Sequence, residues 1–354
     1  MTDDTNDQEV ASTPQDAPDL PSGETQLVLH IGAAKTGSSA IQRFIQLNAD
    51  WLAARDILVP DSRLGMSSKR TGEHVFTLEE LFRRQEKERL TTTLTALCDK
   101  LNPGQRLLLS GENMSNHGRH AFFEDVAKKH PTEVIFYIRR QDELLTSAWQ
   151  QWHSKVEEDF NAWLIMALRQ YGQWEKLIKD WEGVVGAGRV KIRVFDRGDF
   201  PGGDLLKDFL QVLGFDPETS GADFDIGVVN PSYSDIITPL VAGNRNIFKD
   251  ANDSDFYEVV HELTGESYTK GPKYSLISPR QREKIIEFYK PVNQRVCRDY
   301  FPGRARLFPE VDHAKYTYLD DGKLRDLQMR FLTEMAYAAQ RRERKNGKFR
   351  IGWS

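Results

Sequence analysis

The sequence predicts an α/β protein whose central parallel sheet is flanked by helices and followed by a helical C-terminal portion. Two observations support this prediction. Short apolar runs alternate with longer segments of helical periodicity as far as Phe195, which is the pattern of strands that return to one sheet through helical crossovers. Beyond Phe195 the alternation stops and helical spacing dominates. We therefore expect one layered domain rather than two independent ones.

Five short segments are the expected strands. Most are apolar at nearly every position, which is typical of parallel strands that are buried on both faces. They are residues 27–31, 57–60, 106–110, 134–138 and 190–195. The fourth is the clearest, and it leads directly into Arg139 and Arg140.

Helices are expected between and after these strands. Apolar residues recur there every three or four positions, which places them on one face of a helix. The expected helices cover residues 38–54, much of 73–101, the segment from Arg140 to Trp152, and two late segments centred on Phe288 and Phe331.

The composition is typical of a protein that folds in a reducing compartment. Hydrophobic residues make up 39% of the 354 residues and charged residues 29%, so the chain can bury a core and stay in solution. No apolar run approaches the roughly 20 residues of a membrane helix, and the N-terminus lacks the basic and apolar segments of a secretory signal. The two cysteines, Cys98 and Cys297, form neither a disulfide framework nor a zinc motif. We expect a cytoplasmic protein without a membrane span.

The charges divide the chain into three parts. Residues 1–25 contain seven acidic residues and no basic one, together with several prolines, so we expect a disordered acidic tail. One domain is expected over residues 26–340, followed by a basic C-terminal tail, residues 341–354. The body is too evenly charged for general binding of nucleic acid. The oligomeric state stays open.

Residues 32–39 have the ingredients of a phosphate-binding loop. They lie between an expected strand and an expected helix, where backbone N–H groups and the helix N-terminus attract an anion. Lys35 adds a positive charge, and Gly37 allows a close approach of the backbone. The hydroxyl donors are Thr36, Ser38 and Ser39. A magnesium-dependent P-loop places its lysine after the second glycine, whereas Lys35 precedes Gly37, so the order disfavours a nucleotide kinase.

Two later segments add ligands for anions. Arg139 follows the expected strand 134–138, and Ser147 lies eight residues further along the expected helix. An arginine at a strand end can bind a phosphate group through two N–H groups, and a serine two helical turns later can donate to the same anion. A basic loop, Lys270-Gly271-Pro272-Lys273-Tyr274, precedes the late helix centred on Phe288.

In order and spacing, these segments resemble sulfotransferases that use 3′-phosphoadenosine 5′-phosphosulfate (PAPS). The first is similar to their 5′-phosphosulfate loop, typified by P-K-[ST]-G-[ST]-[ST], although Ala34 replaces the proline. The second is similar to their 3′-phosphate motif, a strand followed by Arg and then by Ser eight residues on. The third resembles the K-G-x-K-Y segment of the heparan sulfate N-sulfotransferase-like branch, with Pro272 in place of an arginine. The resemblance covers residues 26–310 and is strongest to bacterial relatives that sulfate glycans.

The resemblance implies a P-loop-like three-layer fold and a set of ligands for PAPS. The residues implied for the 5′-phosphosulfate are Lys35, Thr36, Gly37, Ser38 and Ser39. The residues implied for the 3′-phosphate are Arg139, Ser147, Lys270 and Gly271. It also implies transfer of a sulfuryl group to a hydroxyl or amine, in a carbohydrate by preference, with release of 3′-phosphoadenosine 5′-phosphate (PAP) and no metal. The helices within 62–100 and 155–185 would line the acceptor pocket.

Such a transfer needs a base that takes the acceptor's proton. Glu112 follows the expected strand 106–110, and a glutamate after this strand is the base in the N-sulfotransferase-like branch, so Glu112 is the first candidate. His74 is the second candidate, either as base or as an acceptor contact, and His117 is a weaker one. His30 ends an apolar run and is expected to pack in the core. Lys35 would stabilise charge on the leaving oxygen.

Two other functions remain open on the sequence alone. A kinase or nucleotide transferase with a degenerate P-loop would depend on magnesium. A protein that kept the fold but lost the chemistry would bind PAP and would tolerate loss of Glu112.

Overall fold

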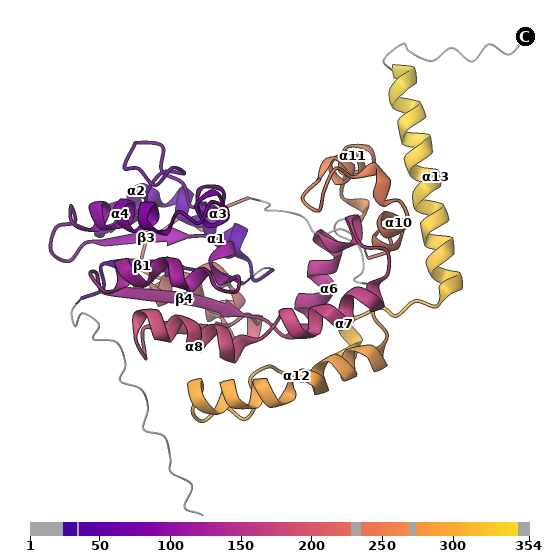
Figure 1. The fold of residues 1–354 in the computed structure, drawn as a ribbon. Coiled ribbons are helices and arrows are strands. Elements are labelled where there is room, and N and C mark those ends of the chain that lie inside the picture. Colours follow the sequence, from indigo (N-terminus) through magenta and orange to yellow (C-terminus); the bar gives the residue numbers. More distant parts are fainter. Residues whose placement is uncertain (1–23, 34, 228–234, 269–273, 346–354) are drawn as a thin grey trace, which may run out of the picture.

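A central sheet of five parallel strands organises the computed structural model, which describes residues 24–33, 35–227, 235–268 and 274–345 (Figure 1). The strand order is β2-β3-β1-β4-β5, and every pairing is parallel. The strands are β1 (Leu27–His30), β2 (Ile57–Leu58), β3 (Arg106–Ser110), β4 (Thr132–Ile138) and β5 (Val190–Val194). The predicted α/β fold with a central parallel sheet is therefore confirmed.

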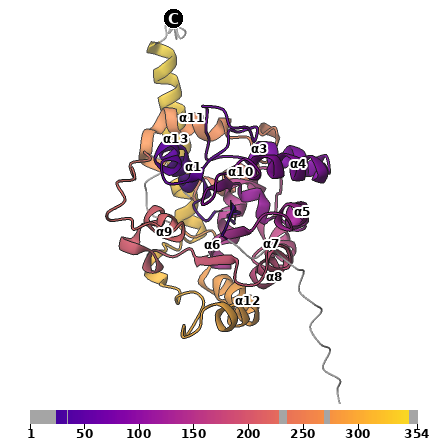
Figure 2. The same cartoon turned by 90° about the vertical axis from the view of Figure 1, so that its left-hand side faces the viewer.

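Helices cover both faces of the sheet, which makes three layers (Figure 2). One face packs on α3 (Val75–Arg83), α4 (Lys87–Cys98), α5 (Glu124–Ala127) and α8 (Trp174–Val185). The other packs on α1 (Ser38–Leu47), α2 (Ala49–Ala53) and α9 (Leu205–Val212). Leu27 and Leu29 point to the first core while Val28 points to the second, as the two-residue period of a strand requires.

The remaining helices form the helical portion beside the carboxyl edge of the sheet (Figure 1). They are α6 (Gln141–Gln151), α7 (Phe160–Gln170), α10 (Thr238–Gly243), α11 (Asp255–Thr264), α12 (Pro279–Tyr300) and α13 (Asp321–Lys345). Short 3₁₀ turns are η1 (Glu112–Ser115), η2 (Arg119–Phe123), η3 (His153–Lys155), η4 (Arg197–Asp199), η5 (Pro201–Gly203), η6 (Arg245–Ile247), η7 (Gly265–Tyr268) and η8 (His313–Lys315). One core joins α6, α7, α10 and α12, and another joins α10, α11 and α13.

Two expected helices are interrupted. The helix expected over 38–54 breaks at Asn48, whose buried side chain donates from Nδ2 to the carbonyl of Asp223 (2.8 Å) and accepts at Oδ1 from the Asp223 N–H (2.8 Å). The helical region 73–101 breaks between α3 and α4, where Gln85 has a φ of 56°. A left-handed residue cannot continue a right-handed helix, so one expected segment becomes two.

The C-terminal helix extends into the expected basic tail. α13 ends at Lys345, so the first five residues of 341–354 are helical. Residues 1–23 of the expected acidic tail lie outside the described residues. No helix in the described part of the chain combines the length and the apolarity that crossing a membrane requires.

Candidate active site

The carboxyl ends of β1, β3 and β4 bring the candidate residues to one edge of the sheet. β1 lies between β3 and β4, and the chain leaves it first toward β2 and β3 and later toward β4 and β5. Such a switch point opens a crevice outside the strand ends, where open α/β sheets bind ligands. The segments that follow these strands hold Lys35, Glu112 and Arg139.

The loop after β1 makes a tight turn, in which two glycines take backbone angles that a residue with a side chain rarely adopts. Gly32 has a φ of 38°, and a Cβ there would lie 2.4 Å from Ser38 Oγ. Gly37 has a φ of 78°, and its Cβ would lie 2.3 Å from a methyl group of Leu205. Lys35 is itself left-handed, with a φ of 65°, a conformation that is strained for a residue with a side chain. Sequence and packing together fix a tight turn.

The hydroxyl groups of this loop hold the turn, and the helix start is left without a side-chain cap. Thr36 Oγ1 donates to the carbonyl of Ala33 (2.6 Å), and Ser38 Oγ donates to the same oxygen (3.5 Å). Both side chains are buried. Gly37 is the N-cap of α1 and offers no side chain, and the first turn of α1 carries no acidic residue. The positive end of α1 is therefore not neutralised by its own first turn.

Lys35 and Glu112 lie within electrostatic range of each other. Burial lowers the pKa of Lys35, the charge of Arg139 lowers it further, and Glu112 opposes both effects. Burial raises the pKa of Glu112, Lys35 opposes this, and the charge of Glu73 raises the pKa further. A carboxylate with a raised pKa is a stronger base than an exposed one. The predicted base and the predicted lysine thus lie in one partly desolvated site.

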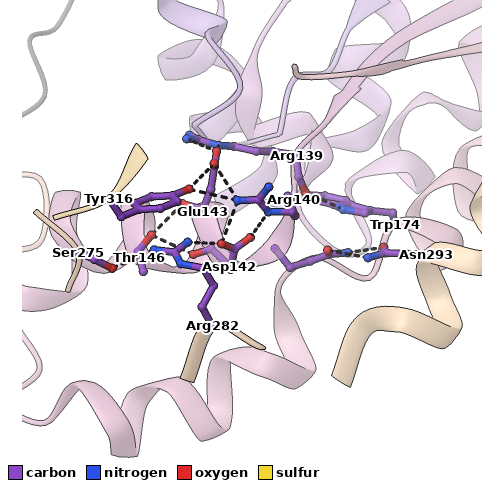
Figure 3. A network of polar contacts seen from close by, with 11 residues as sticks. Arg139, Arg140, Asp142, Glu143, Thr146, Trp174, Ser275, Arg282, Asn293 and Tyr316 are labelled. Carbon is purple, nitrogen blue, oxygen red and sulfur yellow. Dashed lines mark hydrogen bonds and ion pairs between the residues drawn. The ribbon is translucent and has the colours of Figure 1, made fainter. Parts of the chain in front are cut away.

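Arg139 is held on several sides (Figure 3). Its Nη1 donates to the carbonyl of Lys35 (2.7 Å), which joins the end of β4 to the loop after β1. Its Nε and Nη2 donate to Glu143 Oε2 (3.1 and 2.9 Å). The guanidinium also lies over the ring of Phe195, 5.5 Å from its centroid. The arginine predicted for the 3′-phosphate therefore lies beside the predicted phosphosulfate loop.

The other predicted ligands of the donor have less defined positions. Ser147 is half-buried on α6, one helical turn after Glu143, so it shares the helix face of a residue that contacts Arg139. Ser39 is half-buried in the first turn of α1. Lys270 and Gly271 lie outside the described residues.

His74 has a different place from the one that a base requires. It is buried, and its Nε2 donates to the carbonyl of Pro60 (3.3 Å) while its Nδ1 accepts from the Ser110 N–H (3.2 Å). Burial lowers the pKa of its ring. Both nitrogens are thus used to join backbone segments, which argues against His74 as the base and favours Glu112.

His30 packs inside the protein as expected. It is fully buried, its Nδ1 bonds to Ser110 Oγ (2.7 Å), and burial lowers its pKa to about 3. A ring that stays neutral at working pH and contacts Tyr137 and Phe209 by its edges is a core residue.

Sequence reasoning missed two polar residues of the site, Glu143 and Tyr316. Glu143 follows Arg139 by four residues at a helix start, and that spacing could have indicated the ion pair. Tyr316 reaches Glu143 from a segment far along the chain, and its hydroxyl donates to Glu143 Oε1 (2.8 Å). Nothing near Tyr316 in the sequence indicates this contact.

We compared the chain with protein-family models, with curated proteins and with solved structures. No family model matches the chain. An uncharacterised protein from Archaeoglobus fulgidus is 28% identical over 205 residues, which are 57% of this chain and 55% of that protein, so the chain spans about half the length of the curated relative. A sulfotransferase from Alicyclobacillus acidocaldarius has a similar structure with a TM-score of 0.38 and 14% sequence identity, over 78% of this chain and 96% of that chain. A likeness at this TM-score supports no conclusion about the function of the chain.

Proposed function

We propose that this protein is a PAPS-dependent sulfotransferase that transfers a sulfuryl group to a hydroxyl or amine, preferably of a carbohydrate. One observation carries the proposal. Lys35, Glu112 and Arg139 follow three neighbouring parallel strands and interact electrostatically or by hydrogen bond at one edge of the sheet. The same site thus offers cationic groups for a charged donor and a carboxylate base for an acceptor.

The loop after β1 fits a phosphosulfate group. Gly37 has a left-handed φ of 78° that turns the chain into α1, and the N-terminus of α1 lacks a side-chain cap. An anion at this position would be stabilised by backbone N–H groups and by the helix dipole. Lys35 would add its charge, and Arg139 would bind the 3′-phosphate together with Ser147, Lys270 and Gly271.

The proposed reaction is a single in-line displacement. Glu112 accepts the proton of the acceptor, whose oxygen or nitrogen forms a bond to sulfur as the bond from sulfur to the 5′-phosphate oxygen breaks. Lys35 and the N-terminus of α1 stabilise the charge that develops on that leaving oxygen, and PAP is released. The proposal needs no metal, because fixed positive groups perform the charge stabilisation. We place the reaction in the cytoplasm.

Calorimetric titration with PAP tests the donor site. The protein should bind PAP equally with and without magnesium, and Arg139→Ala should weaken that binding at least roughly a hundredfold, because two charge-assisted hydrogen bonds are lost. Glu112→Gln serves as the matched control, since it should leave PAP affinity unchanged. Absence of PAP binding, or magnesium-dependent binding of ATP in its place, would refute the proposal.

Transfer itself is tested with PAPS and a panel of neutral sugars, amino sugars and phenols, with release of PAP as the readout. The wild-type protein should produce PAP only with an acceptor present, and Glu112→Gln should not. PAP binding without any transfer, unaffected by Glu112→Gln, would identify a binding protein that has lost the chemistry.

A further inference from the structure

The contacts of Arg139 leave part of its guanidinium for a ligand. A guanidinium has five N–H groups, and the bonds to Glu143 and Lys35 use three of them among the described residues. Those bonds occupy the edge formed by Nε and Nη2 and one position on Nη1. One N–H on each terminal nitrogen is left, and an arginine can bind a phosphate through two such N–H groups. The direction of these N–H groups depends on where Glu143 is held.

Glu143 is held by two residues on its other oxygen (Figure 3). Its Oε1 accepts from the Tyr316 hydroxyl (2.8 Å) and from Arg140 Nη2 (3.1 Å). Arg140 Nη2 also donates to the Tyr316 hydroxyl (3.1 Å). Burial alone would raise the pKa of Glu143, but the charges of Arg139 and Arg140 and the bond from Tyr316 lower it to about 2. Glu143 is therefore a fixed anion at any working pH.

Tyr316 is positioned by residues from a different part of the chain. The guanidinium of Arg282, on α12, lies 3.8 Å from the centre of the Tyr316 ring. Arg282 is itself buried, and it bonds to Asp142 and to Ser275 Oγ (2.9 Å). Thr317, the residue after Tyr316, pairs with the same segment, because its carbonyl accepts from the N–H of Ser275 (3.0 Å). The hydroxyl of Tyr316 thus transmits the packing of α12 and its flanks to Glu143.

The network keeps a net positive charge. Its three arginines (Arg139, Arg140 and Arg282) face two carboxylates (Asp142 and Glu143), which leaves one positive charge before Lys35 is counted. Glu143 therefore orients Arg139 without making the site neutral, and an anionic ligand is still attracted.

We propose that Tyr316 and Glu143 are positioning residues that aim Arg139 at the 3′-phosphate of the donor. Because Arg139 is that ligand only under the proposed function, the inference rests on that function. Tyr316 acts through Glu143 and touches no ligand. Its loss should therefore weaken recognition of the 3′-phosphate alone, while the rest of the donor binds as before.

The test compares two tyrosines and two ligands. Tyr316→Phe removes only the hydroxyl that holds Glu143, and Tyr318→Phe removes a hydroxyl in the same segment that bonds to His313 Nδ1 (2.8 Å) instead. Calorimetry should show that Tyr316→Phe weakens PAP binding roughly tenfold, the usual size for a hydrogen bond to a charged group. Binding of 5′-AMP, which lacks the 3′-phosphate, should be unchanged in both variants, as should PAP binding by Tyr318→Phe.

The alternative outcomes are distinct. If Tyr316→Phe weakens PAP and 5′-AMP equally, or matches Tyr318→Phe with PAP, the positioning role is wrong although the proposed function stands. If the wild-type protein binds no PAP, both proposals fail. Tyr316→Phe should lower the thermal midpoint more than Tyr318→Phe, because its hydroxyl bonds to the half-buried carboxylate of Glu143. A merely structural bond would weaken the binding of both ligands, whereas a positioning bond weakens the binding of PAP alone.

Discussion

The two halves of the candidate donor site are built in opposite ways. The loop after β1 is held by its own neighbours, since Thr36 and Ser38 bond to Ala33 and Gly37 turns the chain into α1. The Arg139 network instead joins residues from β4 to the segment after η8, including Arg282 and Tyr316. The bonds of the first half lie mostly within a short piece of chain, whereas those of the second join residues far apart in the sequence. Three predictions test this difference, and another concerns the proposed base, Glu112.

The largest effect is expected from Glu112→Gln, which belongs to neither half. The catalytic rate should fall by about 10²- to 10⁴-fold, the usual contribution of a general base, while PAP affinity stays constant. In the wild-type protein the rate should rise with pH through the raised pKa of Glu112, because only the ionised carboxylate can accept a proton. This acidic limb should be absent from the pH profile of the variant. An unchanged limb would show that another group is the base.

The next largest effect concerns the stability of the network. Asp142 is fully buried between Arg140 and Arg282, so Asp142→Ala leaves buried charge without its partner. The free energy of unfolding should fall by about 3–5 kcal/mol, measured by urea denaturation. The exposed pair of Arg298 and Asp299 provides the control, because Asp299→Ala should leave the unfolding curve unchanged. If Asp142→Ala and Asp299→Ala gave the same unfolding curve, burial of the Asp142 ion pairs would not explain their contribution to stability.

A smaller effect is expected from Glu143→Gln, and it should depend on pH. The pKa of Glu143 is about 2 in the folded protein, below its ordinary value of 4.5. The ionised carboxylate therefore stabilises the fold at neutral pH, and this stabilisation is lost as pH falls from about 4.5 toward 2. The variant should be less stable by about 2 kcal/mol at pH 7, and the gap should narrow as the pH is lowered. Urea denaturation between pH 7 and pH 3 measures this difference in the free energy of unfolding. A difference that stays constant would show that it does not come from the lowered pKa of Glu143.

The smallest effect is expected in the local half. Thr36→Val keeps the shape of the side chain but removes the hydroxyl that donates to Ala33. The carbonyl of Ala33 still accepts from the Thr36 N–H (3.3 Å) and from Ser38, so the loss of stability should be about 1 kcal/mol. A loss as large as that of Asp142→Ala would show that the loop is not locally held.

Much of the fold could be predicted because it depends on local patterns. The run at residues 106–110 is a strand with the same bounds in the structure, since apolar residues at successive positions suit a strand buried on both faces. The predictions that failed did so for physical reasons as well. Asn48 ends α1 because its side chain bonds to Asp223, and the sequence gives no sign of a partner so distant.

Some features of the candidate site could be predicted from the sequence and others could not. Lys35, Gly37, Glu112 and Arg139 could be selected from the sequence, because each follows a strand and its residue type suits an anion or a proton. The bonds of His74 could not be predicted, because its backbone partners Pro60 and Ser110 come from separate segments. Spacing along the chain says nothing about which nitrogen of a histidine is already bonded.

Local patterns in the chain were enough to predict the parallel sheet, the turn at residues 32–39 and the charged residues at strand ends. These depend on periodicity, on glycine and on the geometry of strand-to-helix connections, all of which are set within a few residues. The folded protein was needed to show that Tyr316 and Arg282 lie around the first turn of α6, and that Glu143 holds Arg139. Such contacts depend on how distant segments pack, because a hydrogen bond requires partners within about 3 Å, and that distance is fixed by the fold as a whole.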